Sequence, residues 1–223
     1  MPRRRQKQGE TRLPARASAG RREKQPQQPA DPRRDRILSV AERLFAERGH
    51  ERVTVREVAE AAGVTHPLIY YYWGSKMGLL AAALERNQQR VRSLVSQQTD
   101  PRETVLAIIR NYLGEGRLYL LIMARSFLGG MAVGDWPGGY PGMEAAIEAL
   151  LKAAPDDPAW DREVRESVSL ITAMLCGWVL MGEQITDVSG AAQDRGAASS
   201  ERLLAAIDDQ LRKALATVDD TAG

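Results

Sequence analysis

The sequence predicts an all-helical fold, and three observations lead to this prediction. Beyond residue 30, apolar residues recur at spacings of three and four, which places them on one face of a helix. Acidic or hydroxyl residues followed by Pro or by a capping Glu mark several helix starts. No stretch shows the alternating pattern of a β-strand. We therefore expect about nine helices, with an N-terminal three-helix domain at residues 31–78 and a helical body at residues 79–218.

The two ends of the chain are predicted to be disordered tails, at residues 1–30 and 219–223. Residues 1–30 hold nine Arg or Lys, two Glu and four Pro but few apolar residues, so they cannot form a core. This segment carries a charge of +7 in a chain whose net charge is +2. It is either a basic arm that follows DNA phosphates or a solubilising extension.

The first three helices are predicted between Asp31 and Tyr72. In the first, about 33–48, Ile37, Ala41, Leu44 and Phe45 form one apolar stripe, and Gly49 ends it. Thr54 and Glu57 form a capping box that starts a short helix closed by Gly63. Thr65 then caps a second short helix over 66–72. Two short helices joined by such a tight turn indicate a helix-turn-helix.

The body is expected to contain six further helices. We predict them at about 76–97, 101–113, 117–128, 143–153, 158–184 and 199–217. The Gly-rich segment 129–142 is predicted to be irregular and the segment 185–198 to be a linker. The last helix carries a narrow apolar seam of the kind that packs against another helix.

The composition favours a cytoplasmic protein without a membrane span. Cys176 is the sole cysteine of the 223 residues, so no intramolecular disulfide is possible. The longest nearly apolar run, 170–182, is shorter than the ~20 residues that cross a bilayer. No metal site and no cofactor is predicted.

Residues 37–84 resemble the DNA-binding domain of the tetracycline-repressor (TetR) family of bacterial regulators. The resemblance lies in ILSVAERLFAERG, TVREVAEAAGV and THPLIYYYWGSK, with Trp73 and Gly74 where the family more often has Phe and Pro. It implies a regulator, associated with the nucleoid, that binds double-stranded DNA. The implied DNA-binding residues are Thr54, Val55, Arg56, Thr65, His66, Pro67, Leu68, Tyr70, Tyr71 and Lys76.

The resemblance also implies a homodimer that binds a palindromic operator and a small effector that releases it. The last two helices are the expected interface, through Val164, Val168, Ile171, Leu204, Ile207 and Leu211; the alternative is a packing seam within one chain. The effector is expected to be mostly apolar or aromatic. Its candidate pocket residues are Tyr112, Tyr119, Met123, Phe127, Met131, Trp136, Met174 and Trp178.

Two other functions compete with a regulator. A nonspecific DNA-architectural protein would use the basic tail, but it would leave an acidic helical body without a role. An all-helical enzyme is disfavoured because the chain has only two histidines and because Cys176 lies in an apolar helix without a histidine near it in sequence. We therefore predict that the protein is not an enzyme.

Overall fold

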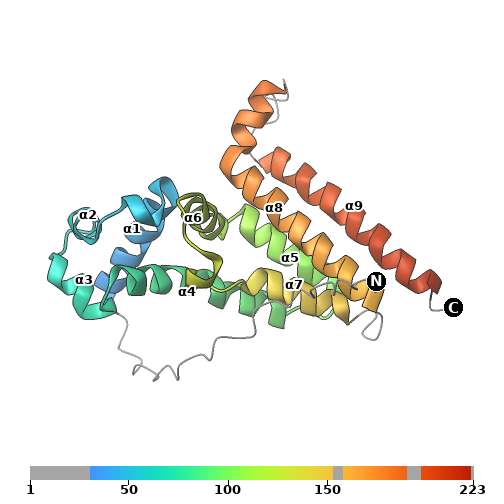
Figure 1. The fold of residues 1–223 in the computed structure, drawn as a ribbon, viewed down its shortest axis with the longest axis horizontal. Helices are drawn as coiled ribbons and strands as arrows, with labels where there is room; N and C mark the ends of the chain where they lie inside the picture. The colour runs from blue at the N-terminus through green and yellow to red at the C-terminus, as the bar shows by residue number, and fades with distance from the viewer. Residues whose placement is uncertain (1–30, 153–157, 190–196, 222–223) are drawn as a thin grey trace, which may run out of the picture. The chain divides into compact units, whose positions relative to one another are not determined.

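The computed structural model describes residues 31–152, 158–189 and 197–221. The predicted basic tail at 1–30 lies outside the described residues. From Pro32 onward the chain forms one compact unit. The helices, drawn in Figure 1, are α1 Pro32–Arg48, α2 Val55–Ala61, α3 His66–Trp73, α4 Lys76–Ser96, α5 Pro101–Leu113, α6 Arg117–Leu128, α7 Pro141–Leu151, α8 Pro158–Val188 and α9 Ala197–Thr221, with short 3-10 helices η1 His50–Arg52 and η2 Val133–Asp135.

These elements confirm the all-helical prediction, because the described residues contain α-helices and 3-10 helices but no strand. Helices α1, α2 and α3 form a three-helix unit, which we call the head. Its core is built on Ile37, Phe45, Val53 and Val58, which are fully buried. Gly49 ends α1 with φ +79° and donates its N–H to the Phe45 carbonyl, so the chain reverses there toward η1.

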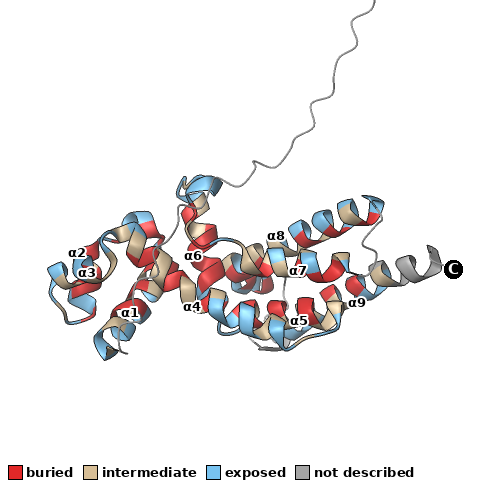
Figure 2. Cartoon of the chain, turned by 90° about the horizontal axis from the view of Figure 1, so that it is seen from below, coloured by how far each residue is buried: buried red, intermediate tan, exposed pale blue. Residues whose placement is uncertain are grey.

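Helix α4 leads from the head into the body, which consists of α5 to α9 (Figure 1). It packs against α1 within the head and against α5 and α7 within the body. Helix α6 lies between α1 and α8, and α5 contacts both α7 and α9. Figure 2 shows that the buried residues of these helices face one another along the unit.

The structure extends three helices by at least two residues beyond their predicted bounds. Helix α7 begins at Pro141, two residues early, because proline is well accommodated in a first helical turn. Helix α8 continues to Val188, where Thr186 is buried and bonds back to the Gly182 carbonyl. Helix α9 runs from Ala197 to Thr221, so it includes three residues of the predicted C-terminal tail.

Candidate nucleic-acid interface and associated cavities

The N-terminus of α2 is held by a reciprocal capping box. The Thr54 hydroxyl accepts a hydrogen bond from the Glu57 backbone N–H at 3.2 Å, and the Thr54 N–H donates to the Glu57 carboxylate at 2.7 Å. Arg48 of α1 reaches the other carboxylate oxygen at 2.9 Å. The hydrogen bond from the Thr54 backbone is the main reason that the pKa of Glu57 falls from 4.5 to about 2. These bonds fix the start of α2 relative to α1.

A tight turn then leads from α2 into α3. Gly63 adopts φ +61°, and the Val64 N–H donates to the Ala59 carbonyl at 2.9 Å. Ile69, only 1% exposed, anchors α3 in the core. The opposite side of α3 carries Tyr70 and Tyr71, which are 42% and 74% exposed. A helix of eight residues therefore presents two large aromatic side chains to solvent.

Most of the residues predicted to bind DNA lie on this exposed surface. Thr65 occupies the N-cap position of α3, and its hydroxyl makes no capping hydrogen bond. Lys76 is half-buried, and its Nζ donates to the Glu51 carbonyl at 3.3 Å. The exposed members of the predicted set are Thr54, Arg56, Thr65, His66, Pro67, Tyr70 and Tyr71.

Two predicted DNA-binding residues are placed differently. The Val55 side chain is 6% exposed and packs in the head core, so the predicted DNA contact of Val55 would have to be made by its backbone and stays a prediction. Val55 is the first residue of α2, and the buried residues Val58 and Ala59 follow it at spacings of three and four. Val55 therefore lies on the apolar side of the helix. Leu68 is half-buried and packs against the core, which leaves only part of its side chain on the surface.

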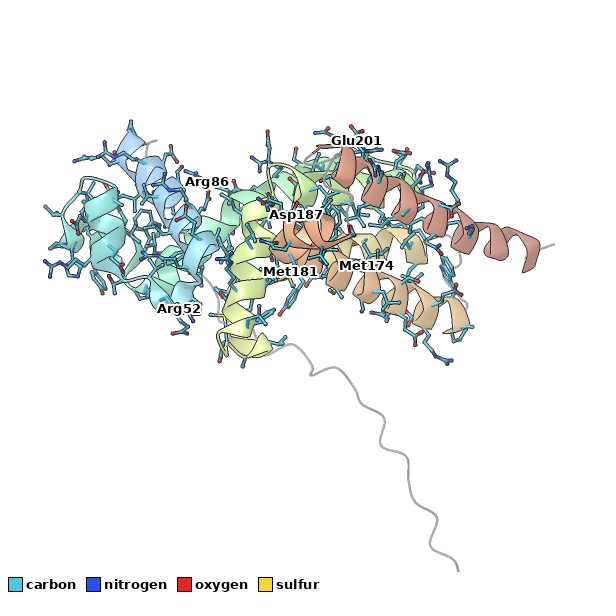
Figure 3. All side chains as sticks on the ribbon, turned by 90° about the horizontal axis from the view of Figure 1, so that it is seen from above. Arg52, Arg86, Met174, Met181, Asp187 and Glu201 are labelled. Atoms are coloured by element: carbon cyan, nitrogen blue, oxygen red, sulfur yellow. The ribbon has the colours of Figure 1, made fainter. Side chains whose placement is uncertain are left out.

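Three arginine and histidine contacts tie the head to α4 and α6. Arg86 of α4 donates to the Asp35 carboxylate and to the Ser39 hydroxyl of α1, both at 2.9 Å. Figure 3 labels Arg86 at this junction. Arg125 of α6 bonds to the Glu47 carbonyl at the end of α1. Helix α1 is therefore attached to α4 through its first half and to α6 through its last turn.

His50 is a third link, and no local sequence pattern predicts it. It is 3% exposed, and its Nδ1 lies 3.1 Å from the Ser126 hydroxyl of α6. Its Nε2 lies 2.8 Å from a Glu51 carboxylate oxygen. Burial lowers the pKa of His50. The order Glu, His, Ser resembles a hydrolase triad, but Ser126 is only 1% exposed and cannot meet a substrate, so we interpret the group as a structural contact.

A small cavity inside the body brings together some of the predicted effector residues. It has a volume of about 30 Å³, and no charged side chain lines it. Trp136 and Phe127 extend its aromatic wall, because Trp136 packs edge-on against both Tyr119 and Phe127. The lining residues are Tyr112, Tyr119, Leu120, Met123, Tyr140, Met143, Thr172 and Leu175.

The remaining effector predictions fall elsewhere. Met131 is half-buried against the core, and Trp178 is half-buried with its ring against Gly182. Neither of them lines the cavity. Met174 does not line the body cavity either. Its side chain is 48% exposed and borders a separate pocket of about 410 Å³ between α8 and α9, so its role in effector binding stays a prediction.

The predicted dimer residues are mostly buried within the single chain. Val164, Val168, Ile207 and Leu211 are at most 4% exposed, which favours the packing within one chain that the sequence left open as an alternative. Helix α8 packs mainly against α6 and α7, and α9 packs against α5, so a role of these four residues in a dimer stays a prediction. Ile171 and Leu204 are half-buried, and their role in an interface stays a prediction. The exposed apolar side chains of α8 are Leu170, Met174, Met181, Ile185 and Val188.

Groups of three or more potential metal-binding side chains were not found among the described residues. Helix α8 is long and apolar enough, by length and composition alone, to cross a bilayer. Core helices of water-soluble proteins pass the same test. Its exposed apolar stripe explains the high hydropathy, since only 22% of the most apolar window is buried within the chain.

Known proteins share both the head and the fold. Residues 37–83 match the family of bacterial regulatory proteins named for tetR. An HTH-type transcriptional repressor of Mycobacterium tuberculosis is 26% identical over 69% of this chain and 76% of its own length. A second HTH-type regulator of that species is 30% identical over 63% of this chain and 73% of its own length.

Among solved structures, a TetR-family regulator from Streptomyces coelicolor shares the fold with a TM-score of 0.57. It is 23% identical and covers 83% of this chain and 87% of its own. The capped helix-turn-helix, the helical body attached to it through α4, and these similarities lead to one conclusion: the chain belongs to the TetR family and is a transcriptional regulator.

Proposed function

We propose that the protein is a ligand-responsive repressor that binds a palindromic DNA operator as a homodimer through α3. The observation that supports this most directly is the exposure of Tyr70 and Tyr71 on a helix anchored by buried Ile69. Two neighbouring exposed aromatic rings form a contiguous apolar surface, and such surfaces mark interaction sites more often than single exposed residues do. Tyrosine offers a ring for base edges and sugars and a hydroxyl for phosphate oxygens.

The surroundings of α3 suit a DNA backbone. The Thr65 hydroxyl stands at the helix N-terminus, where backbone N–H groups favour phosphate oxygens. Arg56, exposed on α2, can contact a phosphate or a guanine edge. Pro67 and the exposed part of Leu68 can contact a thymine methyl group. We infer that α3 enters the major groove while α2 positions it.

A homodimer follows from how little DNA one recognition helix can read. Two heads that bind the half-sites of a palindrome must be held about one helical turn, ~34 Å, apart. The exposed apolar stripe on α8, which includes Met174 and Met181, offers a surface for a second copy of the chain. Binding of effector would move α4 and change the separation of the heads, so that the operator is released.

The uncharged lining of the body cavity suits an effector that carries no charge. Burial raises the pKa of Tyr112 to about 12 and raises that of Tyr119 as well, so both hydroxyls remain neutral at physiological pH. Since no charged side chain lines the cavity, an ionic ligand would lose its hydration without a partner. The cavity of about 30 Å³ must widen to admit a ligand. Segment 129–140, tied to Tyr119 through the Gly139 carbonyl, is the part we expect to move.

Selection of binding sites from a random DNA pool, followed by affinity measurements over a range of salt concentrations, tests the DNA-binding role. We expect one palindromic site to bind at least a thousandfold more tightly than random duplex at the same salt concentration. Tyr71→Ala is expected to weaken operator binding at least tenfold while the protein stays folded, because the side chain is 74% exposed. Lys76→Ala is expected to act in the same direction.

Leu128→Ala is the matched control for Tyr71→Ala. Leu128 is 78% exposed but lies at the end of α6, away from α3. Normal operator binding by both Tyr71→Ala and Lys76→Ala would show that the recognition surface has been misplaced. Equal affinity for the selected site and for random duplex would instead favour an architectural protein.

A further inference from the structure

The 3-10 helix η1 connects the head to the body, and a buried histidine makes the contact. Residues His50–Arg52 lie between α1 and α2 in the chain and pack against α6. Figure 3 labels Arg52, the last residue of η1, beside α6. The His50 side chain is buried and reaches Ser126 of α6. Histidine is the residue whose charge changes most readily near neutral pH, and the proposed function gives this one no role.

Both ring nitrogens of His50 have a partner when the imidazole is neutral. An ionised carboxylate can only accept a hydrogen bond, so the Nε2–H donates to the Glu51 carboxylate at 2.8 Å. The Nδ1 then carries no proton and accepts from the Ser126 hydroxyl at 3.1 Å. Glu51 thus selects the tautomer that suits the hydroxyl of α6.

Protonation of the ring disturbs this arrangement. The added proton on Nδ1 faces the Ser126 hydroxyl, which must then stop donating and turn its own proton elsewhere. The same proton places a positive charge on a buried ring, and burial of a charge is costly. The contact between η1 and α6 is therefore suited to the neutral imidazole.

The charges nearest to the ring leave the neutral form favoured. Burial lowers the pKa of His50 from its ordinary value of 6.5. The Glu51 carboxylate raises this pKa, but Glu51 is 59% exposed, so water screens its charge. The ammonium group of Lys76, at the start of α4, lowers the pKa again. The pKa of His50 therefore lies below 6.5.

The charged groups of α1 and α6 near η1 add no further counter-ion within the part of the chain that the structure describes. Arg125 of α6 is bound to the Glu47 carbonyl, and Arg48 of α1 is bound to the Glu57 carboxylate. Both arginines are cations, so they oppose a positive charge on the ring. The Glu47 side chain is exposed to solvent, which screens its carboxylate.

We propose that η1 is an acid-sensitive link: protonation of His50 opens its contact with α6, while Arg86 keeps α1 attached to α4. The ring then turns toward solvent, where the charged imidazole is hydrated. In the closed contact the pKa of His50 is lower than 6.5. The contribution of the contact to stability is therefore complete above pH 6.5 and is lost as the pH falls through the lowered pKa.

The open link would weaken operator binding, and this step rests on the proposed function. Helix η1 leads directly into Thr54, which caps α2. Its Glu51 carbonyl also accepts a hydrogen bond from Lys76 at the start of α4. A displaced η1 therefore loosens the starts of α2 and α4, which border the candidate DNA surface. Since the two heads must keep a fixed separation on a palindrome, looser heads bind it more weakly.

Nuclear magnetic resonance of the full-length protein tests the link directly. The chain has two histidines, so labelling of the imidazole carbons gives two signals, and His66→Gln identifies the signal of His50. We expect this signal to titrate with a midpoint below pH 6.5. The measurement leaves His50 unchanged, so it does not depend on a variant of the buried residue.

Amide hydrogen exchange then shows whether the contact opens. His50→Gln keeps a polar side chain that cannot become charged, and both proteins are compared at the same pH. The ratio of exchange rates, wild type to His50→Gln, should rise at least threefold from pH 7.5 to pH 5.5 in η1 and in the last turn of α6. The same ratio should stay constant in α5, which is the internal control. A midpoint at or above pH 6.5, or an unchanged ratio in η1 and α6, would overturn the link.

Operator affinity at pH 7.5 and pH 5.5 tests the regulatory role. The wild type should lose at least threefold more affinity than His50→Gln over this range. Glu42, whose pKa is raised by burial, and His66 are present in both proteins, so their titration cancels in the comparison. Equal losses in the two proteins would overturn the regulatory role. A protein that selects no operator would contradict the proposed function alone, because the ring midpoint and the amide exchange decide the link without DNA.

Discussion

At the scale of single residues, hydrogen bonds between near neighbours set the start of α2. Thr54 and Glu57 are three residues apart, and the backbone N–H of each donates a hydrogen bond to the side chain of the other. Removal of such a cap costs about 1 kcal/mol, which is the effect that we expect for Thr54→Ala. The cap fixes the conformation of the chain at the start of the helix-turn-helix. The loss of stability in Thr54→Ala is therefore expected to affect the candidate DNA surface directly.

The stability that Glu57 contributes should depend on pH. Its pKa falls from 4.5 to about 2 in the folded protein, so folding favours the ionised carboxylate. The contribution is therefore complete above pH 4.5 and is lost as the pH falls toward 2. Thermal unfolding of the wild type and of Glu57→Gln should differ most near pH 6, and the difference should shrink toward pH 3. Glu60→Gln, exposed on the same helix outside the cap, is the control. A difference that stays constant from pH 6 to pH 3 would contradict this assignment.

Contacts between single residues also show what can and cannot be predicted from the sequence. The Thr54 cap and the Gly63 turn were correctly predicted because each depends on residues within a few positions. The contact of His50 with Ser126 joins residues 76 positions apart, and no local pattern announces it. The burial of Val55 was missed because family resemblance indicates a position on a helix and not the direction of its side chain.

At the scale of elements, helix periodicity predicted the helices but not their partners. The apolar stripes of α8 and α9 were identified, yet Val164, Val168, Ile207 and Leu211 pack within the chain. A stripe at three and four spacing records that a face is buried, and it does not record which helix covers it. Helix α9 in fact contacts α5, and a long-range ion pair between Arg102 and Asp208 supports this arrangement.

That ion pair predicts how α9 is attached. Arg102 of α5 binds Asp208 of α9 with two parallel hydrogen bonds, at 2.6 and 2.8 Å, and this lowers the pKa of Asp208 to about 2. Asp208→Asn should therefore increase amide hydrogen exchange in α9 more than in α5. Lys213→Ala is the control, since Lys213 pairs with Asp209 one turn away on α9 itself. Unchanged exchange of α9 in Asp208→Asn would show that apolar contacts alone hold this helix.

At the scale of the whole molecule, α8 leaves an apolar face exposed to solvent. Leu170, Met174, Met181 and Ile185 are all at least 48% exposed, and they recur at intervals of four and seven. Gly177 lies in the same stripe, and nothing within 4 Å would meet a Cβ added to it. A small residue in the middle of an apolar stripe allows a second helix to approach closely, which suits the α8 of another copy of the chain.

Met181→Glu tests this interface. Because Met181 is 54% exposed, the substitution should change the stability of the single chain by less than about 0.5 kcal/mol. In a dimer, however, two carboxylates would be buried against apolar side chains without partners, which costs several kcal/mol. Sedimentation equilibrium should show a dimer for the wild type, at least a hundredfold weaker association for Met181→Glu, and loss of binding to the full palindrome. Leu128→Glu, which places the same charge on an exposed apolar residue of α6, should remain dimeric. If Met181→Glu sediments as the wild-type dimer, the interface lies on another face of the molecule.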